Sequence, residues 1–158
     1  MPDQKTLQET FEYREGNLYW KIRPANNVQI GDKVGNSRSY SPTSLKGKKI
    51  YVHQIVFMIF HGYLPSTIDF KDGNPHNTRI NNLREASRSK AIANSRKRSN
   101  NTSGYKGVSW NHRSEKWASY ITKEKKTMHL GYFTDKEEAY RAYCNAAVKY
   151  HGEFANLG

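Results

Sequence analysis

An interruption in the middle of the chain constrains the fold more than any other feature. Between residues 95 and 107 the sequence reads SRKRSNNTSGYKG, where Ser, Asn, Thr and Gly crowd together between two patterned regions. Such a composition is typical of a linker. Only 35% of the 158 residues are hydrophobic, which favours two small cores over one large core. The sequence therefore predicts a first domain at residues 1–98, a linker at 99–103 and a second domain at 104–158.

The second domain begins with short stretches in which aromatic or branched residues alternate with polar ones. Three strands are predicted by YKGVSWN, KWASYIT and TMHLGYF, and turns by the charged runs HRSE and KEKK between them. A helix is predicted by TDKEEAYRAYCNAAVKYHG, in which Ala139, Tyr143 and Ala147 fall on one face. Thr134 and Glu137 form a capping box at its start. We expect a three-stranded antiparallel sheet packed on one helix, with the other sheet face free for a partner.

The first domain opens with FEYREGNLYWKI, which predicts two short aromatic strands around a tight turn. A strand is expected at KIYV, and a buried helix at VHQIVFMIFHG that ends at Gly62. After Pro65 the sequence predicts a strand at TIDF, a loop at KDGNPHNTRIN, a second strand at NLREAS and a helix over RSKAIANSRKR, capped by Ser87 or Ser89. Strand, loop, strand and helix make a compact ββα unit. The expected fold class of the chain is α+β.

The charge of the chain predicts the kind of partner. The formal net charge is +12 and the isoelectric point is near 9.8, which indicates a polyanion: DNA, RNA or an anionic membrane. No apolar run approaches the ~18 residues of a membrane span. The first ten residues carry an acid and no apolar region, so no secretory signal is expected. The single Cys144 excludes an internal disulfide and fits a reducing cytosol. A nucleic acid is therefore the expected partner, with no membrane, and the expected location is cytoplasmic.

Cleavage of a phosphodiester with a metal ion requires groups that a ββα unit can carry. A divalent cation must hold the scissile phosphate and stabilise the leaving oxygen, and hard oxygen ligands must hold that cation. A general base, usually His, must activate water. In such a unit the carboxylate and the base lie at the end of the first strand, and a second ligand lies on the helix.

Both halves of the chain resemble known families. Residues 50–98 resemble the HNH endonuclease family, in its phage and homing form, through VHQIVFMIFHGYLP and the core stretch IDFKDGNPHNTRINNLREASRSKAIAN. Residues 104–158 resemble the AP2 DNA-binding domain through GYKGVSWNHRSEKWASYI, HLGYF and EEAYRAYCNAAVKYHGEFANL. The two modules occur together, in this order, in phage-type proteins. The resemblance implies a phage-type protein that binds double-stranded DNA in the cytoplasm of a bacterial host, on the nucleoid when it is bound to DNA.

The resemblance also assigns roles to the residues of the core motif. Asp69 matches the acid that binds the metal, and Asn82 matches the central Asn that orients the site. Phe70 stands where the family has its general-base His, and Ala91 where it has a second metal ligand, an Asn. Phe has no proton acceptor and Ala has no side-chain oxygen, so the resemblance implies a degenerate centre. We expect no cofactor, and Mg²⁺ only if activity remains. His76 is either a substitute base or a loop residue that contacts phosphate.

The candidate DNA contacts are basic and aromatic side chains from both domains. The cluster that ends the helix predicted over residues 88–98 is expected to contact phosphates, and the sheet face is the reading surface of the AP2 family. Trp117 belongs either to that surface or to the core, and Ser109 and Thr122 match further contact positions. The candidates are Lys46, Lys48, Lys49, Arg84, Arg88, Arg96, Lys97, Arg98, Lys106, Trp110, Arg113, Lys116, Tyr120 and His129.

Three functions fit these features. The first is a DNA-binding protein with an inactive centre, which occupies DNA as a regulator or blocks access to a site. The second is a nicking endonuclease that uses Asp69 with a substitute base. The third is an inhibitor that turns its basic surface against a host nucleic-acid-processing or defence complex. A metal-dependent nicking assay separates the second from the first, and a pull-down from nuclease-digested host lysate separates the third.

Overall fold

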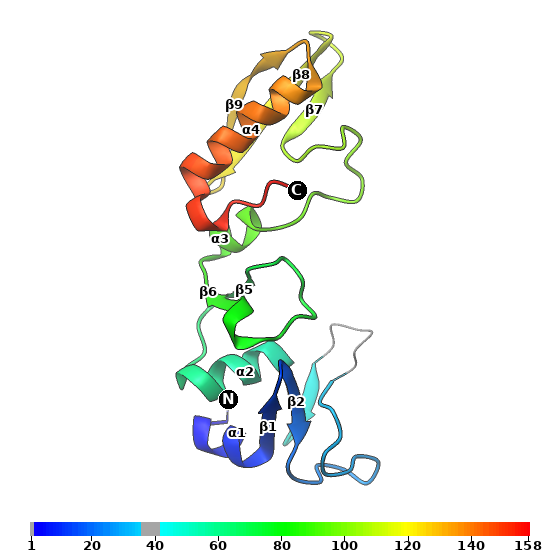
Figure 1. Cartoon of the computed structure of the whole chain (residues 1–158), viewed down its shortest axis with the longest axis vertical. Coiled ribbons are helices and arrows are strands. Elements are labelled where there is room, and N and C mark those ends of the chain that lie inside the picture. Colours follow the sequence, from blue (N-terminus) through cyan, green and yellow to red (C-terminus); the bar gives the residue numbers. More distant parts are fainter. Residues whose placement is uncertain (1, 36–41) are drawn as a thin grey trace. The chain divides into compact units, whose positions relative to one another are not determined.

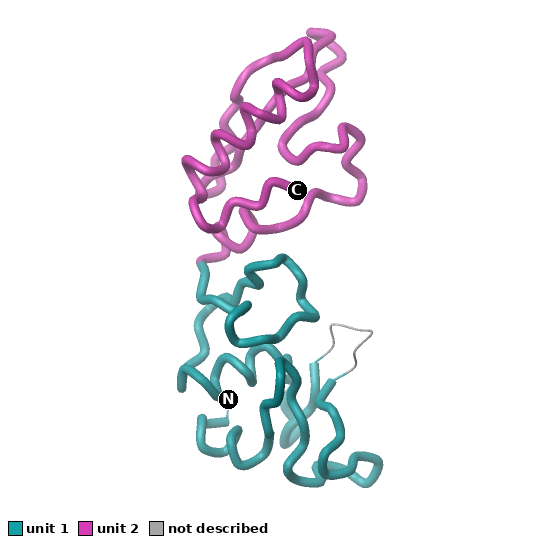
Figure 2. The backbone as a smooth tube through the Cα atoms, in the orientation of Figure 1, with its two compact units in different colours: residues 1–86 teal, residues 87–158 magenta. Residues whose placement is uncertain are grey.

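The computed structural model describes residues 2–35 and 42–158, and the chain divides into two compact units. Unit 1 is Met1–Ala86 and unit 2 is Ser87–Gly158 (Figure 2). Small antiparallel sheets and helices make up both units, which confirms the α+β class. No helix in the described ranges has the length and apolarity to cross a membrane. The boundary between the units falls in the sequence after Ala86, ahead of the linker expected from composition. The domain assignment at residues 1–98 and 104–158 stays a prediction.

Unit 1 is built from short elements around one core (Figure 1). Its strands form three two-stranded antiparallel sheets, β1–β2, β3–β4 and β5–β6. The elements are α1 (Gln4–Thr10), β1 (Phe11–Arg14), β2 (Asn17–Trp20), β3 (Thr43–Leu45), β4 (Lys48–Ile50), α2 (Val52–His61), β5 (Ile68–Phe70), the 3₁₀ turn η1 (Ile80–Asn82) and β6 (Leu83–Glu85).

The expected hairpin and the expected buried helix of unit 1 are both confirmed. β1 pairs with β2 around a turn at Glu15 and Gly16, and α2 ends at Gly62, whose φ of 77° suits the left-handed conformation of a C-cap. The apolar face of α2 buries Ile55 and Val56 completely. Helix α2 therefore forms the centre of the core, against which β5 and β6 are positioned.

Unit 2 is a three-stranded antiparallel sheet in the order β7–β8–β9, with α4 packed along it (Figure 1). Ile121 of the sheet and Tyr143, Ala146 and Ala147 of α4 form the buried centre of this packing. The helical spacing predicted that Tyr143 and Ala147 share one face. The N-cap of α4 is Asp135, whose side chain accepts a hydrogen bond from a backbone N–H, and the expected cap one residue earlier is wrong. The elements are α3 (Arg88–Ala93), β7 (Val108–Asn111), β8 (Lys116–Lys123), β9 (Lys126–Phe133), α4 (Lys136–His151) and η2 (Gly152–Phe154).

The helix predicted over residues 88–98 is wrong in its second half, because α3 ends at Ala93. The Oγ of Ser87 caps its start, as expected for one of the two candidate serines. At its other end, Lys106 Nζ donates hydrogen bonds to the carbonyl oxygens of Ala93 and Ser95. These bonds satisfy carbonyls that a longer helix would have paired internally. The RKR cluster at residues 96–98 therefore lies beyond the helix.

The stretch expected to be an exposed linker is partly built into unit 2. Ser103 is 5% exposed, and its Oγ donates a hydrogen bond to the carbonyl of Val108 at 2.7 Å. Asn101 Nδ2 donates to the carbonyl of Tyr105 at 2.9 Å. A little further along, Gly107 has a φ of 75° and lies where a Cβ would overlap the ring of a core tyrosine. Polar composition alone did not indicate this packing.

Candidate functional site

The pairing of β5 with β6 sets Asp69 opposite Arg84. Arg84 Nε donates to Asp69 Oδ2 at 2.8 Å, and the exposures of the two side chains are 12% and 7% respectively. Asp69, the acid that the family resemblance implies as a metal ligand, thus forms a buried ion pair. Arg84, expected as a DNA contact, faces this carboxylate. The guanidinium neutralises the negative charge of the carboxylate, and a divalent cation would need that charge in order to bind.

Phe70, at the expected position of the general base, packs against an imidazole. Its ring centroid lies 5.2 Å from that of His53, which α2 supplies. His53 is 7% exposed, and burial lowers its pKa to about 4. An efficient general base has a pKa near the working pH. The imidazole that touches this position is therefore neutral and a weak base at pH 7.

The loop between β5 and β6 is held by a network around Asp72 and Asn82. Asn82 Nδ2 donates to Asp72 Oδ1 at 3.0 Å and to the carbonyl of Asn77 at 2.8 Å, while its Oδ1 accepts from the backbone N–H of Asp72. Burial would raise the pKa of Asp72, but hydrogen bonds from Asn77, Asn74 and Asn82 outweigh it and hold that pKa below its ordinary value. Asn82 therefore has the contacts of a residue that orients the loop.

The remaining candidates for metal chemistry do not complete a site. His76 is exposed in the loop, and its backbone N–H donates to the side chain of Asn74. Ala91 lies on α3 in unit 2. Across residues 2–35 and 42–158, no three His, Cys, Asp or Glu side chains gather where they could hold a metal ion. Asp69 in its ion pair and a methyl side chain do not fit the oxygen shell of Mg²⁺.

The basic candidates differ in how their charges are placed. Lys46, Lys48 and Lys49 are exposed around the β3–β4 turn of unit 1, and Arg88 and the cluster at residues 96–98 are exposed in unit 2. Lys106 is different, because its ammonium group donates to three backbone carbonyls. Burial lowers the pKa of Lys106 to about 8. A phosphate contact by Lys106 would have to compete with these bonds.

The strand register of unit 2 divides the aromatic candidates between the two faces of the sheet. Trp110 pairs with Trp117, so both point to one face, and Lys136 of α4 lies 5.8 Å from the Trp117 ring. That face carries the helix. Tyr120 pairs with His129 on the open face. Trp110 is 40% exposed but does not belong to the open face.

The open face carries a row of rings that sequence reasoning found only in part. The ring centroids of Tyr120 and His129 are 5.0 Å apart, and those of His129 and Tyr132 are 4.4 Å apart. Tyr132 is 48% exposed and was not among the candidates. A register shift between Ser119 and Tyr120 breaks the simple alternation along HLGYF, which hid this residue. Arg113 and Lys116 are exposed at the β7–β8 turn and its edge.

Comparison with known proteins places this geometry in a family context. The HNH endonuclease family matches residues 50–91, which span α2, the β5–β6 pair and most of α3. The chain is also 36% identical over 90 residues to Protein 3.8 of Escherichia phage T7. That alignment covers 57% of this chain and 74% of the phage protein.

Proposed function

The chain belongs to the family of Protein 3.8 of Escherichia phage T7, and from this premise we propose that it binds double-stranded DNA without cutting it. The HNH endonuclease-like domain at residues 50–91 supplies a scaffold shaped for nucleic acid. The net charge of +12 supplies the attraction to a polyanion.

The observation that carries the proposal is the state of Asp69 and Phe70. Asp69 is 6% exposed and bonded to Arg84, and Phe70 fills the position of the base with a ring that cannot accept a proton. Loss of a general base alone slows a reaction about 10²–10⁴-fold. The absence of an oxygen ligand on the side chain of Ala91 adds to this loss, because Mg²⁺ holds weakly to a single carboxylate.

The DNA contacts proposed here come from exposed groups of each unit. In unit 1 they are the lysines of the β3–β4 turn, and in unit 2 they are the cations at residues 96–98 and the open sheet face. Rings on a sheet face give sequence-tolerant contact area, and Lys or Arg side chains neutralise phosphates. Each neutralised phosphate releases counterions, so binding should weaken steeply with salt.

Two assays on the full chain test the proposal together. Fluorescence anisotropy with a labelled duplex should show an affinity that falls strongly between about 50 and 200 mM NaCl. Supercoiled plasmid incubated with Mg²⁺ or Mn²⁺ should show no more nicking than a buffer control. Binding that does not respond to salt would reject the DNA surface. Robust cleavage that disappears in Asp69→Ala would reject the inactive centre.

A second function, DNA nicking, is favoured by one observation, the HNH endonuclease match at residues 50–91. In this alternative Asp69 works with a base from another position, and His76 is the exposed imidazole of the loop. The discriminating variant is His76→Ala, which abolishes nicking in this alternative and changes nothing if the centre is inactive. No contact among the described residues bears on an inhibitor of a host complex, which stays a prediction.

A further inference from the structure

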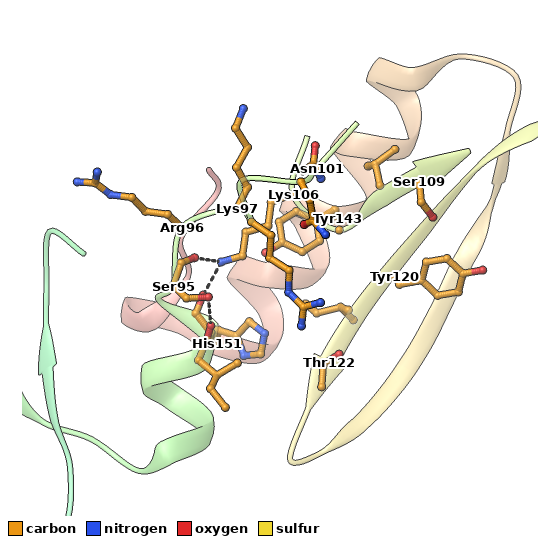
Figure 3. Close-up of a pocket in the computed structure, with 17 residues that line it drawn as sticks. Ser95, Arg96, Lys97, Asn101, Lys106, Ser109, Tyr120, Thr122, Tyr143 and His151 are labelled. Carbon is orange, nitrogen blue, oxygen red and sulfur yellow. Dashed lines mark hydrogen bonds between the residues drawn. The ribbon is translucent and has the colours of Figure 1, made fainter. Parts of the chain in front are cut away.

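Unit 2 contains a cleft of about 470 Å³ between residues 92–101 and the strands β7 and β8. Figure 3 shows Lys106 and His151 on one side of it and Ser109, Tyr120 and Thr122 on the other. The three cations of residues 96–98 also line it, and the lining residues that the structure describes include no Asp or Glu. A partly open cleft lined by cations without a carboxylate attracts anions.

The inner wall of the cleft is fixed before any ligand arrives. Lys106 Nζ donates to the carbonyls of Ala93 at 2.8 Å and Asn156 at 3.1 Å, and to that of Ser95. Asn156 Nδ2 in turn donates to the carbonyl of Asn94 at 2.8 Å. These bonds tie the end of α3, the following segment and the C-terminal tail together. Because this wall is already ordered, little conformational entropy is lost when a ligand binds.

The charge inside the cleft is positive and not neutralised by a carboxylate. Among the described residues, the ammonium group of Lys106 donates its hydrogen bonds to three backbone carbonyl oxygens. Burial lowers the pKa of His151, and the charges of Lys106 and Lys123 lower it further. An anion in this cleft would therefore meet unbalanced positive charge.

Arg98 is suited to hold such an anion directly, whereas the side chain of Arg96 points away from the other labelled lining residues in Figure 3. Arg98 is exposed and lines the cleft, and no side chain or carbonyl of the described residues accepts a hydrogen bond from its guanidinium. A guanidinium donates two parallel hydrogen bonds to a phosphate. Asn100 also lines the cleft and has a neutral side-chain amide that can donate.

We propose that this cleft is a phosphate-binding site and that the phosphate it takes belongs to the backbone of duplex DNA. The proposal rests on the proposed function, since it names where that DNA is gripped. The DNA backbone is favoured over a free nucleotide because Ser109, Tyr120 and Thr122 belong to the open sheet face and also line the cleft. A strand crossing the open face thus passes directly into the cleft.

Two arms on the full chain test the site and its source of phosphate. In the first, inorganic phosphate is titrated into ¹⁵N-labelled protein, with NaCl at equal ionic strength as the control salt. We expect saturable amide shifts confined to the residues that line the cleft, which Arg98→Ala abolishes. In the second, duplex binding is measured against salt. Arg98→Ala should bind duplex about tenfold more weakly. The slope of log affinity against log salt concentration should fall by about the contribution of one neutralised phosphate. The matched control is Arg141→Ala, an exposed arginine on α4 that should change neither result.

Each outcome decides part of the proposal. Equal shifts with phosphate and NaCl overturn the phosphate site. Specific phosphate shifts with unchanged DNA affinity and salt slope in Arg98→Ala overturn the DNA source and leave a free phosphate compound as the ligand. A wild-type chain that binds no duplex at all overturns the proposed function and the DNA source, while the first arm still decides whether the cleft holds phosphate.

Discussion

Removing one partner of the Asp69–Arg84 pair should destabilise unit 1 far more than loss of a surface ion pair would. The N–O distance is 2.8 Å and the side chains keep only 7% and 12% of their exposure, so the pair belongs to the buried class. Exposed pairs contribute roughly 0.2–1 kcal/mol. Removing one member of a buried pair costs about 3–5 kcal/mol, because the other charge stays buried without that partner. We therefore expect Arg84→Met to lose about 3–5 kcal/mol of unfolding free energy in unit 1.

A double-mutant cycle distinguishes the interaction energy of the pair from the individual contributions of the two side chains. Asp69→Asn should also destabilise unit 1, because the guanidinium then remains buried without a carboxylate. The double variant should be less destabilised than the sum of the singles by at least about 2 kcal/mol. Hydrogen exchange of peptides from residues 1–86 in the full chain measures this, since it reports the opening of unit 1 by itself.

Two results would refute this reasoning. Single variants that each lose less than about 1 kcal/mol would place the pair in the exposed class. Slower exchange of β5 with added Mg²⁺ in the wild type, absent in Asp69→Asn, would show that the carboxylate binds metal despite Arg84. In that case the proposal of an inactive centre would have to be withdrawn.

The remaining predictions concern packing, protonation and catalysis. Gly107→Ala should unfold about 1–3 kcal/mol more easily than Gly104→Ala, because both have a positive φ but only the first Cβ overlaps a ring; equal melting temperatures would contradict this. In the folded chain burial lowers the pKa of His53 to about 4. Below about pH 6.5 the unfolded chain therefore takes up a proton on His53 that the folded chain does not. The unfolding free energy of unit 1 should fall by up to about 3 kcal/mol as pH falls from 6.5 to 4. Hydrogen exchange measured against pH should show that His53→Gln removes this fall. Phe70→His with Ala91→Asn should still leave plasmid intact with Mg²⁺, because neither change removes Arg84 from Asp69; nicking by the double variant that neither change gives alone would count against the inhibiting role of this ion pair.

Local patterns predicted the elements of this chain well where one stretch of sequence decides the outcome. The hairpin at FEYREGNLYWKI and the helix that ends at Gly62 follow from spacing and turn chemistry within a few residues. The end of α3 did not follow, because Lys106 satisfies its carbonyls from a distant position in the sequence. The role of Ser103 was missed for the same reason, since polar composition does not reveal a buried hydroxyl contact.

The candidate site was predictable in its residues but not in their contacts. Resemblance selected Asp69 and Phe70, yet the ion pair with Arg84 depends on the cross-strand register of β5 and β6. The contact between Phe70 and His53 depends on how α2 packs against the hairpin. Both contacts depend on tertiary structure, which the spacing of residues in the sequence does not predict. Tyr132 was missed because a register shift displaced it from simple alternation.

An endonuclease-like scaffold and a loss of cleavage are compatible because different contacts support each. The loop after β5 is held by the hydrogen bonds of Asp72 with Asn82, and none of these uses the positions of the base or the second ligand. Phe70 adds apolar contact with His53 where a catalytic imidazole would need water. The loop can therefore keep its shape, and the likeness to the HNH endonuclease family can persist, in a chain that does not cleave DNA. The proposed function depends on exposed basic side chains such as Lys48 and Arg98, so DNA affinity and its salt dependence test it more directly than the family match does.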